Sequence, residues 1–427
     1  MRLLSTMMKR FVQTGALTII DVDGRAHEFG PEDISADDPR ATIRLHDKKL
    51  YKDLFLNPEL RAGEAYMDGT LTVEDGTIRD FLTLFAINAS NLRGHPLQKA
   101  VRKHYKRIKR YHQKNFRKAA KSNVQHHYDL SNDFYKLFLG EDMQYSCAYY
   151  ERPDMTLEEA QLAKKRHIAA KLNIKPGQKI LDLGCGWGGM AIYLAQNFDV
   201  HVTGVTLSTQ QHKLAIERVV KAGLTGKVDI LLQDYRDLPG PFDRIVSVGM
   251  FEHVGTPQFA EFFNKVSDLL TDDGSMLLHS IGRRGGPGST ARWIRKYIFP
   301  GGYSPALSET LAVVEQSGLW VTDIEILRLH YAETCLEWER RFQANRDKVS
   351  SMMDEKFCRM WEFYLIISEL SFRYSKNMNF QMQLGKGRHA LPITRDYMGK
   401  AEAKLKRLET KKDLETKKRK TTKKQKK

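Results

Sequence analysis

The residues best suited to chemistry lie in a glycine-rich turn between a predicted strand and a predicted helix. The segment Ile180-Leu-Asp-Leu-Gly-Cys-Gly-Trp-Gly-Gly189 places Gly184, Gly186 and Gly189 in the pattern G-x-G-x-x-G. Glycine lets the backbone turn tightly and lets a ligand approach where a Cβ would otherwise intervene. A nicotinamide dinucleotide would also need an acidic residue about 20 positions later to bind its ribose. The segment Thr203-Gly-Val-Thr-Leu-Ser208 has no acidic residue, so a dehydrogenase is disfavoured.

The order of acidic residues and strands around this turn favours one class of domain. Asp182 precedes the first glycine by two residues, and Asp234 follows the third predicted strand. Phe242-Asp-Arg-Ile-Val-Ser247 forms the fourth strand, and Leu269-Leu-Thr-Asp-Asp-Gly-Ser275 leads into the fifth. This order resembles that of the class I S-adenosylmethionine-dependent methyltransferases. The resemblance implies that S-adenosylmethionine is the cofactor and that Asp182 helps to hold its cationic amino-acid end.

The same resemblance implies a wider set of cofactor-binding residues. Thr206, Ser208 and Gln210 would supply neutral hydrogen bonds to the ribose, while Tyr235 and Arg236 would flank the adenine. The full implied set is Tyr145, Ser146, Asp182, Gly184, Gly186, Gly188, Thr206, Ser208, Gln210, Asp234, Tyr235 and Arg236.

The segment after the fourth strand argues against a nucleic acid as methyl acceptor. DNA enzymes that methylate amino groups carry a Pro-Pro-aromatic sequence there, whereas this chain has Ser247-Val-Gly-Met-Phe-Glu-His-Val254. The Pro-Cys nucleophile of the cytosine-C5 enzymes is also absent. We therefore expect no specific nucleic-acid partner.

Further motifs lie on both sides of the glycine turn. In chain order the motifs are His127-Tyr-Asp-Leu-Ser-Asn-Asp-Phe-Tyr135, Gln144-Tyr-Ser-Cys-Ala-Tyr149, the glycine turn, Met250-Phe-Glu-His-Val-Gly255, His279-Ser-Ile-Gly282, Tyr297-Ile-Phe-Pro-Gly-Gly302 and His330-Tyr331. Together they resemble one family of lipid-modifying enzymes, the cyclopropane-fatty-acyl-phospholipid synthases and the related mycolic acid cyclopropane synthases. The resemblance covers roughly residues 121–395, and Gly63-Glu-Ala-Tyr-Met-Asp-Gly69 resembles the extra N-terminal domain of the phospholipid-acting branch.

The resemblance implies transfer of a methylene group from S-adenosylmethionine to cis double bonds of phospholipid acyl chains. A cis double bond is a weak nucleophile that must be held close and in line with the methyl donor. The resulting carbocation needs π-rich walls and exclusion of water, and a base must then remove a proton so that the ring closes. By resemblance the base is a bound bicarbonate ion, and no metal is involved. The residues implied to hold the ion are Cys147, Glu252, His279, Tyr331 and the backbone of Ile281.

The chain departs from the family pattern at one position. The family often shows Cys-Ala-x-x-Phe-Arg near the C-terminal end, where this chain has Ser368-Glu-Leu-Ser-Phe-Arg373. A serine cannot act as a thiolate nucleophile, but a route through a carbocation and bicarbonate needs no covalent enzyme intermediate. The alternative outcome is methyl addition without ring closure, which would give a branched or methylidene chain.

The implied cofactor-binding and catalytic residues can form one site only if a sheet brings the ends of several strands together. Strands are predicted at 179–183, 200–205, 228–232, 243–248 and 275–280, with helices at about 188–197, 208–222 and 257–270. Thr156 and Glu159 form a capping box that opens another helix, which runs to about Leu172. Such alternation predicts an α/β fold, a Rossmann-like and mostly parallel sheet with helices on both faces.

The sequence divides into four predicted parts, of which the methyltransferase domain is the third. Residues 1–90 read as a small, separate α+β domain with a hairpin around Asp23-Gly24, a strand at 41–45 and helices at 54–66 and 78–89. Residues 91–120 read as a basic linker, in which 97–118 is a predicted amphipathic helix that is either membrane-binding or a solvated linker. The methyltransferase domain occupies 121–398. Residues 399–427 read as a Lys-rich tail, helical at most early on and disordered beyond Lys417.

Charge and composition predict where the protein works. The 427 residues carry a net charge of +17, of which residues 91–121 contribute +12 and residues 400–427 contribute +10, so the remainder is slightly acidic. With 41% hydrophobic residues global disorder is excluded. Four widely spaced cysteines without a Cys-x-x-Cys pair favour a reducing cytoplasm. Basic segments of this kind attract polyanions, either an anionic membrane surface or nucleic acid bound nonspecifically. We expect a cytoplasmic protein, without a spanning helix, that associates peripherally with anionic lipids of the inner membrane surface. The alternatives are a nucleic-acid-associated protein that uses the methyltransferase fold for binding and a non-catalytic membrane module. The resemblance implies a homodimer formed through residues 1–90.

Overall fold

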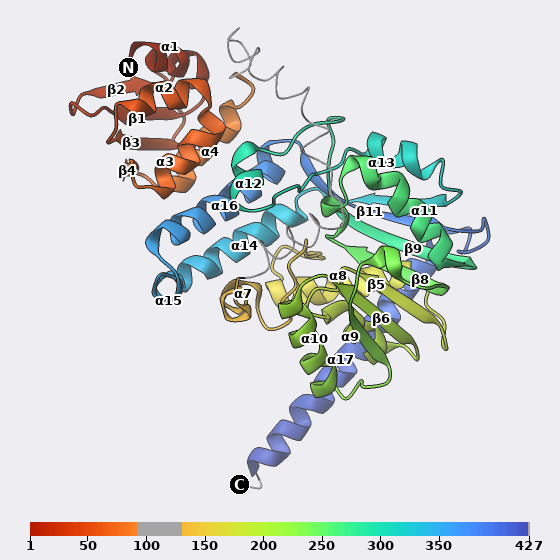
Figure 1. Cartoon of the computed structure of the whole chain (residues 1–427). Helices are drawn as coiled ribbons and strands as arrows, with labels where there is room; N and C mark the ends of the chain where they lie inside the picture. The colour runs from red at the N-terminus through yellow and green to blue at the C-terminus, as the bar shows by residue number, and fades with distance from the viewer. Residues whose placement is uncertain (92–129, 426–427) are drawn as a thin grey trace.

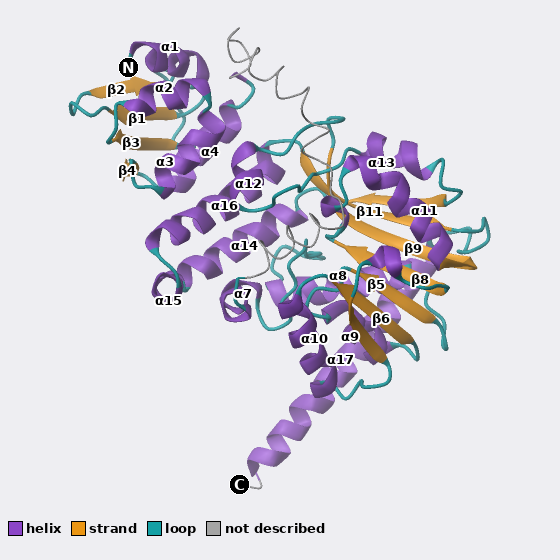
Figure 2. Cartoon of the chain, viewed as in Figure 1, coloured by secondary structure: helices purple, strands orange, loops and turns teal. Residues whose placement is uncertain are grey.

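The structure is a computed structural model that describes residues 1–91 and 130–425 (Figure 1). It contains a small four-stranded sheet near the N-terminus and a seven-stranded sheet in the rest of the chain (Figure 2). The predicted basic helix at 97–118 lies outside the described residues, as does the linker 91–120 apart from its first residue.

The N-terminal sheet has the strand order β2-β1-β3-β4. The predicted hairpin is confirmed, since Leu17 pairs with Phe29 across an antiparallel ladder, and β3 joins β1 in parallel. The predicted helix at 54–66 is instead two helices, because Pro58 has no N–H to continue the first helix and begins the second. The strands are β1 (Ala16–Ile20), β2 (Ala26–Phe29), β3 (Arg40–Leu45) and β4 (Leu71–Asp75), and the helices are α1 (Arg2–Phe11), α2 (Lys49–Leu56), α3 (Pro58–Met67) and α4 (Ile78–Asn88).

The large sheet confirms the predicted α/β class. Its strand order is β10-β11-β9-β8-β5-β6-β7, and β11 runs antiparallel to both of its neighbours while the other pairs are parallel. The five predicted strands are present, and the sequence analysis did not identify β10 or β11. The strands are β5 (Lys179–Leu183), β6 (His201–Thr206), β7 (Val228–Leu232), β8 (Phe242–Val248), β9 (Leu270–Arg283), β10 (Trp320–Ile326) and β11 (Asn377–Gly385).

Helices cover both faces of this sheet. One buried cluster joins the strands to α11 and α13, and a second joins them to α8, α9 and α10. The capping box at Thr156 is confirmed, because its Oγ1 accepts a hydrogen bond from the backbone N–H of Glu159 and the Glu159 carboxylate accepts one from the backbone N–H of Thr156. The helices are α8 (Leu157–Lys171), α9 (Gly189–Asn197), α10 (Thr209–Lys221), α11 (Phe259–Leu269) and α13 (Leu307–Val314).

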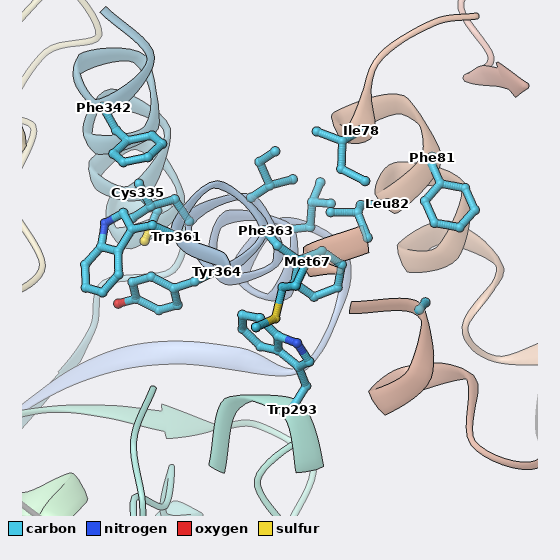
Figure 3. Close-up of a cluster of buried hydrophobic side chains, with 14 of the residues drawn as sticks. Met67, Ile78, Phe81, Leu82, Trp293, Cys335, Phe342, Trp361, Phe363 and Tyr364 are labelled. Carbon is cyan, nitrogen blue, oxygen red and sulfur yellow. The ribbon is translucent and has the colours of Figure 1, made fainter. Parts of the chain in front are cut away.

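A helical layer joins the N-terminal domain to the large sheet (Figure 1). It consists of α7 (Asn132–Leu139), α12 (Arg292–Tyr297), α14 (His330–Ala344), α15 (Arg346–Met352) and α16 (Glu355–Tyr374). Phe81 and Leu82 of the N-terminal domain belong to the same buried cluster as Trp293, Trp361 and Phe363 of this layer (Figure 3). Residues 1–90 therefore share one continuous hydrophobic core with the helices that follow and are not a separately packed unit.

The C-terminal segment is a helix, α17 (Asp396–Gln425), which extends beyond the early part that the sequence analysis expected to be helical. Its first half packs on α8, where Leu405 is buried and Glu402 Oε1 lies 2.6 Å from His167 Nδ1. This docked half fixes the first turns, and the Lys- and Glu-rich continuation needs only good helix propensity to extend them. Neither α17 nor any other helix of the described residues is long and apolar enough to cross a membrane.

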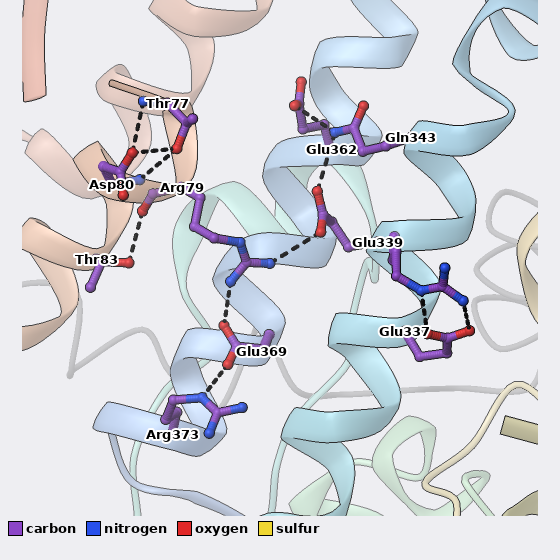
Figure 4. Close-up of polar contacts among 11 residues, drawn as sticks. Thr77, Arg79, Asp80, Thr83, Glu337, Glu339, Gln343, Glu362, Glu369 and Arg373 are labelled. Carbon is purple, nitrogen blue, oxygen red and sulfur yellow. Dashed lines mark hydrogen bonds and ion pairs between the residues drawn. The ribbon is translucent and has the colours of Figure 1, made fainter. Parts of the chain in front are cut away.

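Polar contacts supplement the apolar contact between the N-terminal domain and α16. Arg79 of α4 donates to Glu369 Oε2 at 2.9 Å and to Glu339 Oε2 at 3.3 Å (Figure 4). Glu369 is 1% exposed and also accepts a hydrogen bond from Arg373. A buried carboxylate needs such partners, because leaving one uncompensated is costly.

We expect the change Arg79→Met to destabilise the protein by about 2 kcal/mol, because it removes one of the two cations that face the buried Glu369 carboxylate. The midpoint of urea unfolding measures this loss. Arg340→Met is the matched control, since the Arg340 side chain is 72% exposed and, among the described residues, forms an ion pair only with Glu337 of its own helix. Equal effects of the two substitutions would contradict the role given to Arg79.

Candidate active site

A first cavity opens at the carboxyl ends of β5, β6 and β8, beside the glycine turn. Gly184 and Gly186 have φ of +77° and +56°, which other residues rarely adopt. At Gly184 a Cβ would also lie 2.8 Å from the Cβ of Met250, so the chain behind the cavity could not pack as it does. The turn therefore exposes its backbone to whatever occupies the cavity.

Most of the predicted cofactor-binding residues line this cavity together. They come from the segment before α8, from the ends of β5 and β6, and from the turn after β7. Those that line it are Tyr145, Ser146, Asp182, Gly184, Gly186, Thr206, Asp234, Tyr235 and Arg236.

Three predicted cofactor-binding residues do not line the cavity. Ser208 is the N-cap of α10, and its Oγ accepts from the backbone N–H of Gln211 at 3.3 Å. Gln210 is exposed on the first helical turn, whereas Gln211 lines the cavity and accepts a hydrogen bond from Thr206 Oγ1 at 2.9 Å. Consecutive helical residues point about 100° apart. The residue at which α10 begins therefore determines whether Gln210 or Gln211 faces the cavity. Gly188 is the N-cap of α9 and faces α10.

A buried carboxyl lines the first cavity, and a buried lysine lies behind its lining, where it contacts Gln144 and Ser146. Asp182 is 2% exposed, and burial raises the pKa of its carboxyl to about 7. Lys164 of α8 is fully buried, and its Nζ donates to Gln144 Oε1 at 2.6 Å and to Ser146 Oγ at 2.8 Å. Burial lowers the pKa of Lys164 to about 7. The sequence analysis did not identify Lys164. The only indication in the sequence was that a lysine stands within the predicted helix that precedes the first strand of the sheet.

The other end of this cavity carries a rigid polar pair. Arg236 donates through Nε and Nη2 to the two carboxylate oxygens of Asp234, at 2.9 and 2.6 Å. The neighbouring Tyr235 ring packs edge-on against Phe262, with the centroids 5.6 Å apart. A planar guanidinium and an aromatic ring are thus fixed at the wall where a flat base could bind.

A second cavity adjoins the first and shares Tyr145, Gly249 and His253 with it. Its inner wall is rich in aromatic and aliphatic side chains from α12, α14 and α16 and the segments beside them. These include Ile294, Phe299, Tyr331, Cys335, Tyr364, Ile367 and Phe372. Ser368, which stands where the family often has cysteine, lines the same wall.

Glu252 is the single acidic residue among those that line the second cavity. It lies in the short helix η3 (Phe251–His253) after β8, and its Oε1 accepts from the backbone N–H of Ile281 at 2.6 Å. Its Oε2 is buried and has no hydrogen-bond partner among the described residues. Burial raises the pKa of Glu252 to about 7. The side chain can therefore change protonation state near neutral pH, as a general base must.

Two predicted catalytic residues, His279 and Cys147, line neither cavity. The sequence analysis placed His279 at a strand end, but β9 continues to Arg283 and β11 pairs alongside it. His279 is buried there, with Nε2 2.8 Å from Asn379 Nδ2 and Nδ1 3.1 Å from Gln381 Nε2, and burial keeps its pKa well below the ordinary value.

Cys147 is also fully buried, and its thiol donates to the carbonyl of Ala148 at 3.3 Å. Burial raises the pKa of this thiol, so the residue is a neutral thiol rather than a thiolate. Of the five residues expected to surround one ion, Glu252, Ile281 and Tyr331 line the second cavity, and the other two lie outside its lining.

Comparison with known proteins agrees with this architecture. The family model for mycolic acid cyclopropane synthetase matches residues 115–382. The chain is 38% identical to the cyclopropane-fatty-acyl-phospholipid synthase of Escherichia coli strain K12, over 81% of this chain and 88% of the relative. It is 36% identical to a probable fatty acid methyltransferase of Pseudomonas putida, over 88% and 94% respectively.

Solved structures show the same relationship. A mycolic acid cyclopropane synthase in complex with SAH and CTAB matches with a TM-score of 0.60 and 37% identity, over 62% of this chain and 98% of that chain. The predicted class I S-adenosylmethionine-dependent methyltransferase fold is confirmed, and the chain is an enzyme of that class. On its sequence and its fold, the chain belongs to the mycolic acid cyclopropane synthetase family.

Proposed function

We propose that this enzyme transfers a methylene group from S-adenosylmethionine to cis double bonds of phospholipid acyl chains and forms cyclopropane rings. The observation that carries the proposal is the adjoining pair of cavities, in which an apolar, aromatic space with one buried carboxyl meets the cofactor cavity at Tyr145, Gly249 and His253. A fatty chain fits such a lining, and the name of the Escherichia coli relative states this activity for that protein.

The residues of the first cavity orient the methyl donor. When bound, S-adenosylmethionine supplies an electrophilic methyl group on a positively charged sulfur. Asp182 would pair with its amino group, Thr206 and Gln211 would hydrogen-bond to its ribose, and Tyr235 and Arg236 would hold its adenine. These contacts would direct the sulfur toward the shared wall of the two cavities, where an alkene can be held in line.

The second cavity provides the surroundings that a carbocation requires. Tyr331, Tyr364 and Phe372 present aromatic side chains, which stabilise a cation and exclude water that would otherwise trap it. His253 lines both cavities, and burial lowers its pKa to about 4, so it adds no positive charge beside the cation. Glu252 supplies the negative charge.

The residues around Glu252 suit a bicarbonate ion as the immediate base. The buried Oε2 of Glu252 can accept the hydroxyl hydrogen of bicarbonate, and Tyr331, whose side chain lines the same cavity, can donate its hydroxyl to the ion. The backbone N–H of Ile281 donates to Glu252 Oε1 and so positions the carboxyl that holds the ion. Bicarbonate would supply an oxygen that accepts a proton. His279 would act from behind this wall, through its position in β9, rather than by touching the ion.

The proposal favours a ring over a branched product. Ser368 lines the cavity, and its hydroxyl can contact the chain but cannot form the thiolate that a covalent route would use. Glu252 provides a carboxyl with a pKa of about 7 at the site where a proton must leave. Loss of that proton from the new methyl group closes the ring, whereas a saturated branch would need a reductant in place of a base.

The activity is tested by incubating the enzyme with labelled S-adenosylmethionine and vesicles of cis-unsaturated phospholipid. We expect each modified chain to gain one CH₂ and lose its double bond, as seen by mass spectrometry and gas chromatography. A methylidene product, which keeps an unsaturation, would instead support methyl addition without ring closure. Absence of label in the lipid would contradict the proposed function.

We expect Glu252→Gln to lower kcat at least 100-fold with little change in cofactor affinity, because Glu252 lines the second cavity and not the first. The wild-type rate should rise as the pH increases through about 7, since the protonated carboxyl cannot accept the hydroxyl hydrogen of bicarbonate. Turnover measurements and calorimetry with S-adenosylhomocysteine separate the two effects. A comparable loss of cofactor affinity would contradict the role assigned to Glu252.

We also propose that the basic end of α17 helps the enzyme dock on anionic lipid. Residues 413–427 contain eight Lys/Arg and two Asp/Glu, and each basic residue near an anionic surface contributes about 1 kcal/mol to binding.

Deletion of residues 413–427 should weaken binding to anionic vesicles at low salt, and the loss of affinity should be smaller at high salt because salt screens the charges. Sedimentation with vesicles measures both affinities. The deletion must stop at 413, because Glu402, Leu405 and Glu409 pack against the domain. Unchanged binding to anionic vesicles would contradict the proposal that the basic end of α17 docks on lipid.

A further inference from the structure

Two cationic side chains lie together where the second cavity opens to solvent. Arg283 is the last residue of β9, and Lys376 immediately precedes β11. The two strands pair there, with Asn377 opposite Arg283, and the backbone N–H of Arg284 donates to the carbonyl of Lys376 at 3.0 Å. Both side chains line the cavity whose inner end holds Glu252.

Neither cation is paired with a carboxylate among the described residues. The Arg283 guanidinium donates to backbone carbonyls, from Nε to Ser304 at 2.9 Å and from Nη2 to Ser289 at 3.4 Å. Lys376 is exposed and forms no ion pair within the described part of the chain. By contrast, Arg373 on the adjacent α16 is bonded to both Glu333 and Glu369. Positive charge is thus uncompensated at the mouth of the cavity.

A glycine-rich loop that contains Gly285 and Gly288 passes close to the Arg283 and Lys376 side chains. A Cβ on Gly288 would lie 1.4 Å from Arg283 Nη1, and one on Gly285 would lie 2.9 Å from Lys376 Nζ. The loop can lie this close to both groups only because it lacks side chains there. The hydroxyl-bearing residues Ser289, Thr290, Ser304 and Ser375 line the same region.

We propose that Arg283 and Lys376 form a phosphate subsite that binds the phosphodiester of the substrate lipid at the mouth of the second cavity. Nε and Nη2 of Arg283 already donate to backbone carbonyls, so the charge and the remaining donors of its guanidinium would act together with the Lys376 ammonium on the phosphate oxygens. The acyl chain would then run inward along Phe299, Ile367 and Phe372 to reach Glu252. This inference rests on the proposed function and specifies which part of the lipid the enzyme recognises. Free inorganic phosphate shares this chemistry and is the alternative ligand.

The test compares two lipids with identical cis-unsaturated chains, phosphatidylglycerol and diacylglycerol, each dilute in neutral detergent micelles. Full-length wild type, Lys376→Met, Arg283→Met and Arg283→Lys are assayed, and S-adenosylhomocysteine binding verifies that each variant is folded. We expect the ratio of kcat/KM for phosphatidylglycerol to that for diacylglycerol to fall about tenfold in each Met variant. Arg283→Lys, which keeps the charge, should retain part of the preference.

Lys175→Met is the matched control, since Lys175 is an exposed lysine in the turn before β5, at the edge of the sheet opposite the cavities. It should leave the ratio unchanged. A ratio that is also unchanged in the Arg283 and Lys376 variants would overturn the subsite. If inorganic phosphate binds wild type but not the variants while the ratio stays unchanged, the groups bind free phosphate and not the lipid. Wild type that converts neither lipid would contradict the proposed function itself, and the subsite with it.

Discussion

Removal of water from the carboxyl edge of the large sheet is the condition on which the rest of this site depends. Glu252 and Asp182 have pKa values of about 7 because both are buried, and the same burial keeps His253 neutral. In bulk water the two carboxyls would be permanently ionised and an alkyl cation would be captured at once. The fold therefore has to close two adjoining cavities while leaving each an opening for its ligand.

The helical layer performs this closure, and the N-terminal domain supports it. Tyr331 comes from α14, and Tyr364 and Ser368 come from α16, so one wall of the second cavity lies outside the Rossmann-like sheet. The opposite side of α16 packs on α3 and α4, where Phe81 shares a core with Phe363 (Figure 3). The N-terminal domain thus stabilises the helix that shapes the second cavity.

A chain of hydrogen bonds connects the C-terminal helix to the buried face of β9. Glu402 of α17 contacts His167, which contacts Glu325, and Glu325 is paired with Lys171. Lys171 Nζ donates to Gln381 Oε1 at 2.8 Å, and Gln381 contacts His279. Because Lys171 binds the amide oxygen of Gln381, the amide nitrogen is left to face His279. This arrangement explains why His279 is held within the sheet and does not line a cavity.

The sequence by itself determined the cofactor fold and the glycine turn, because local order along the chain is enough to specify a strand, a tight turn and a helix. The role of Glu252 was implied by the family resemblance and stays a prediction. Lys164, Gln211 and the positions of His279 and Cys147 could not be obtained this way. Each depends on which face of a helix or strand meets another element, and β11, which covers His279, follows it by about a hundred residues. The first half of α17 is ordered by contact with α8, a partner far away in the chain that composition alone does not reveal. Tertiary packing decided these points because burial and pairing, unlike helix or turn propensity, are properties of segments brought together from distant parts of the chain.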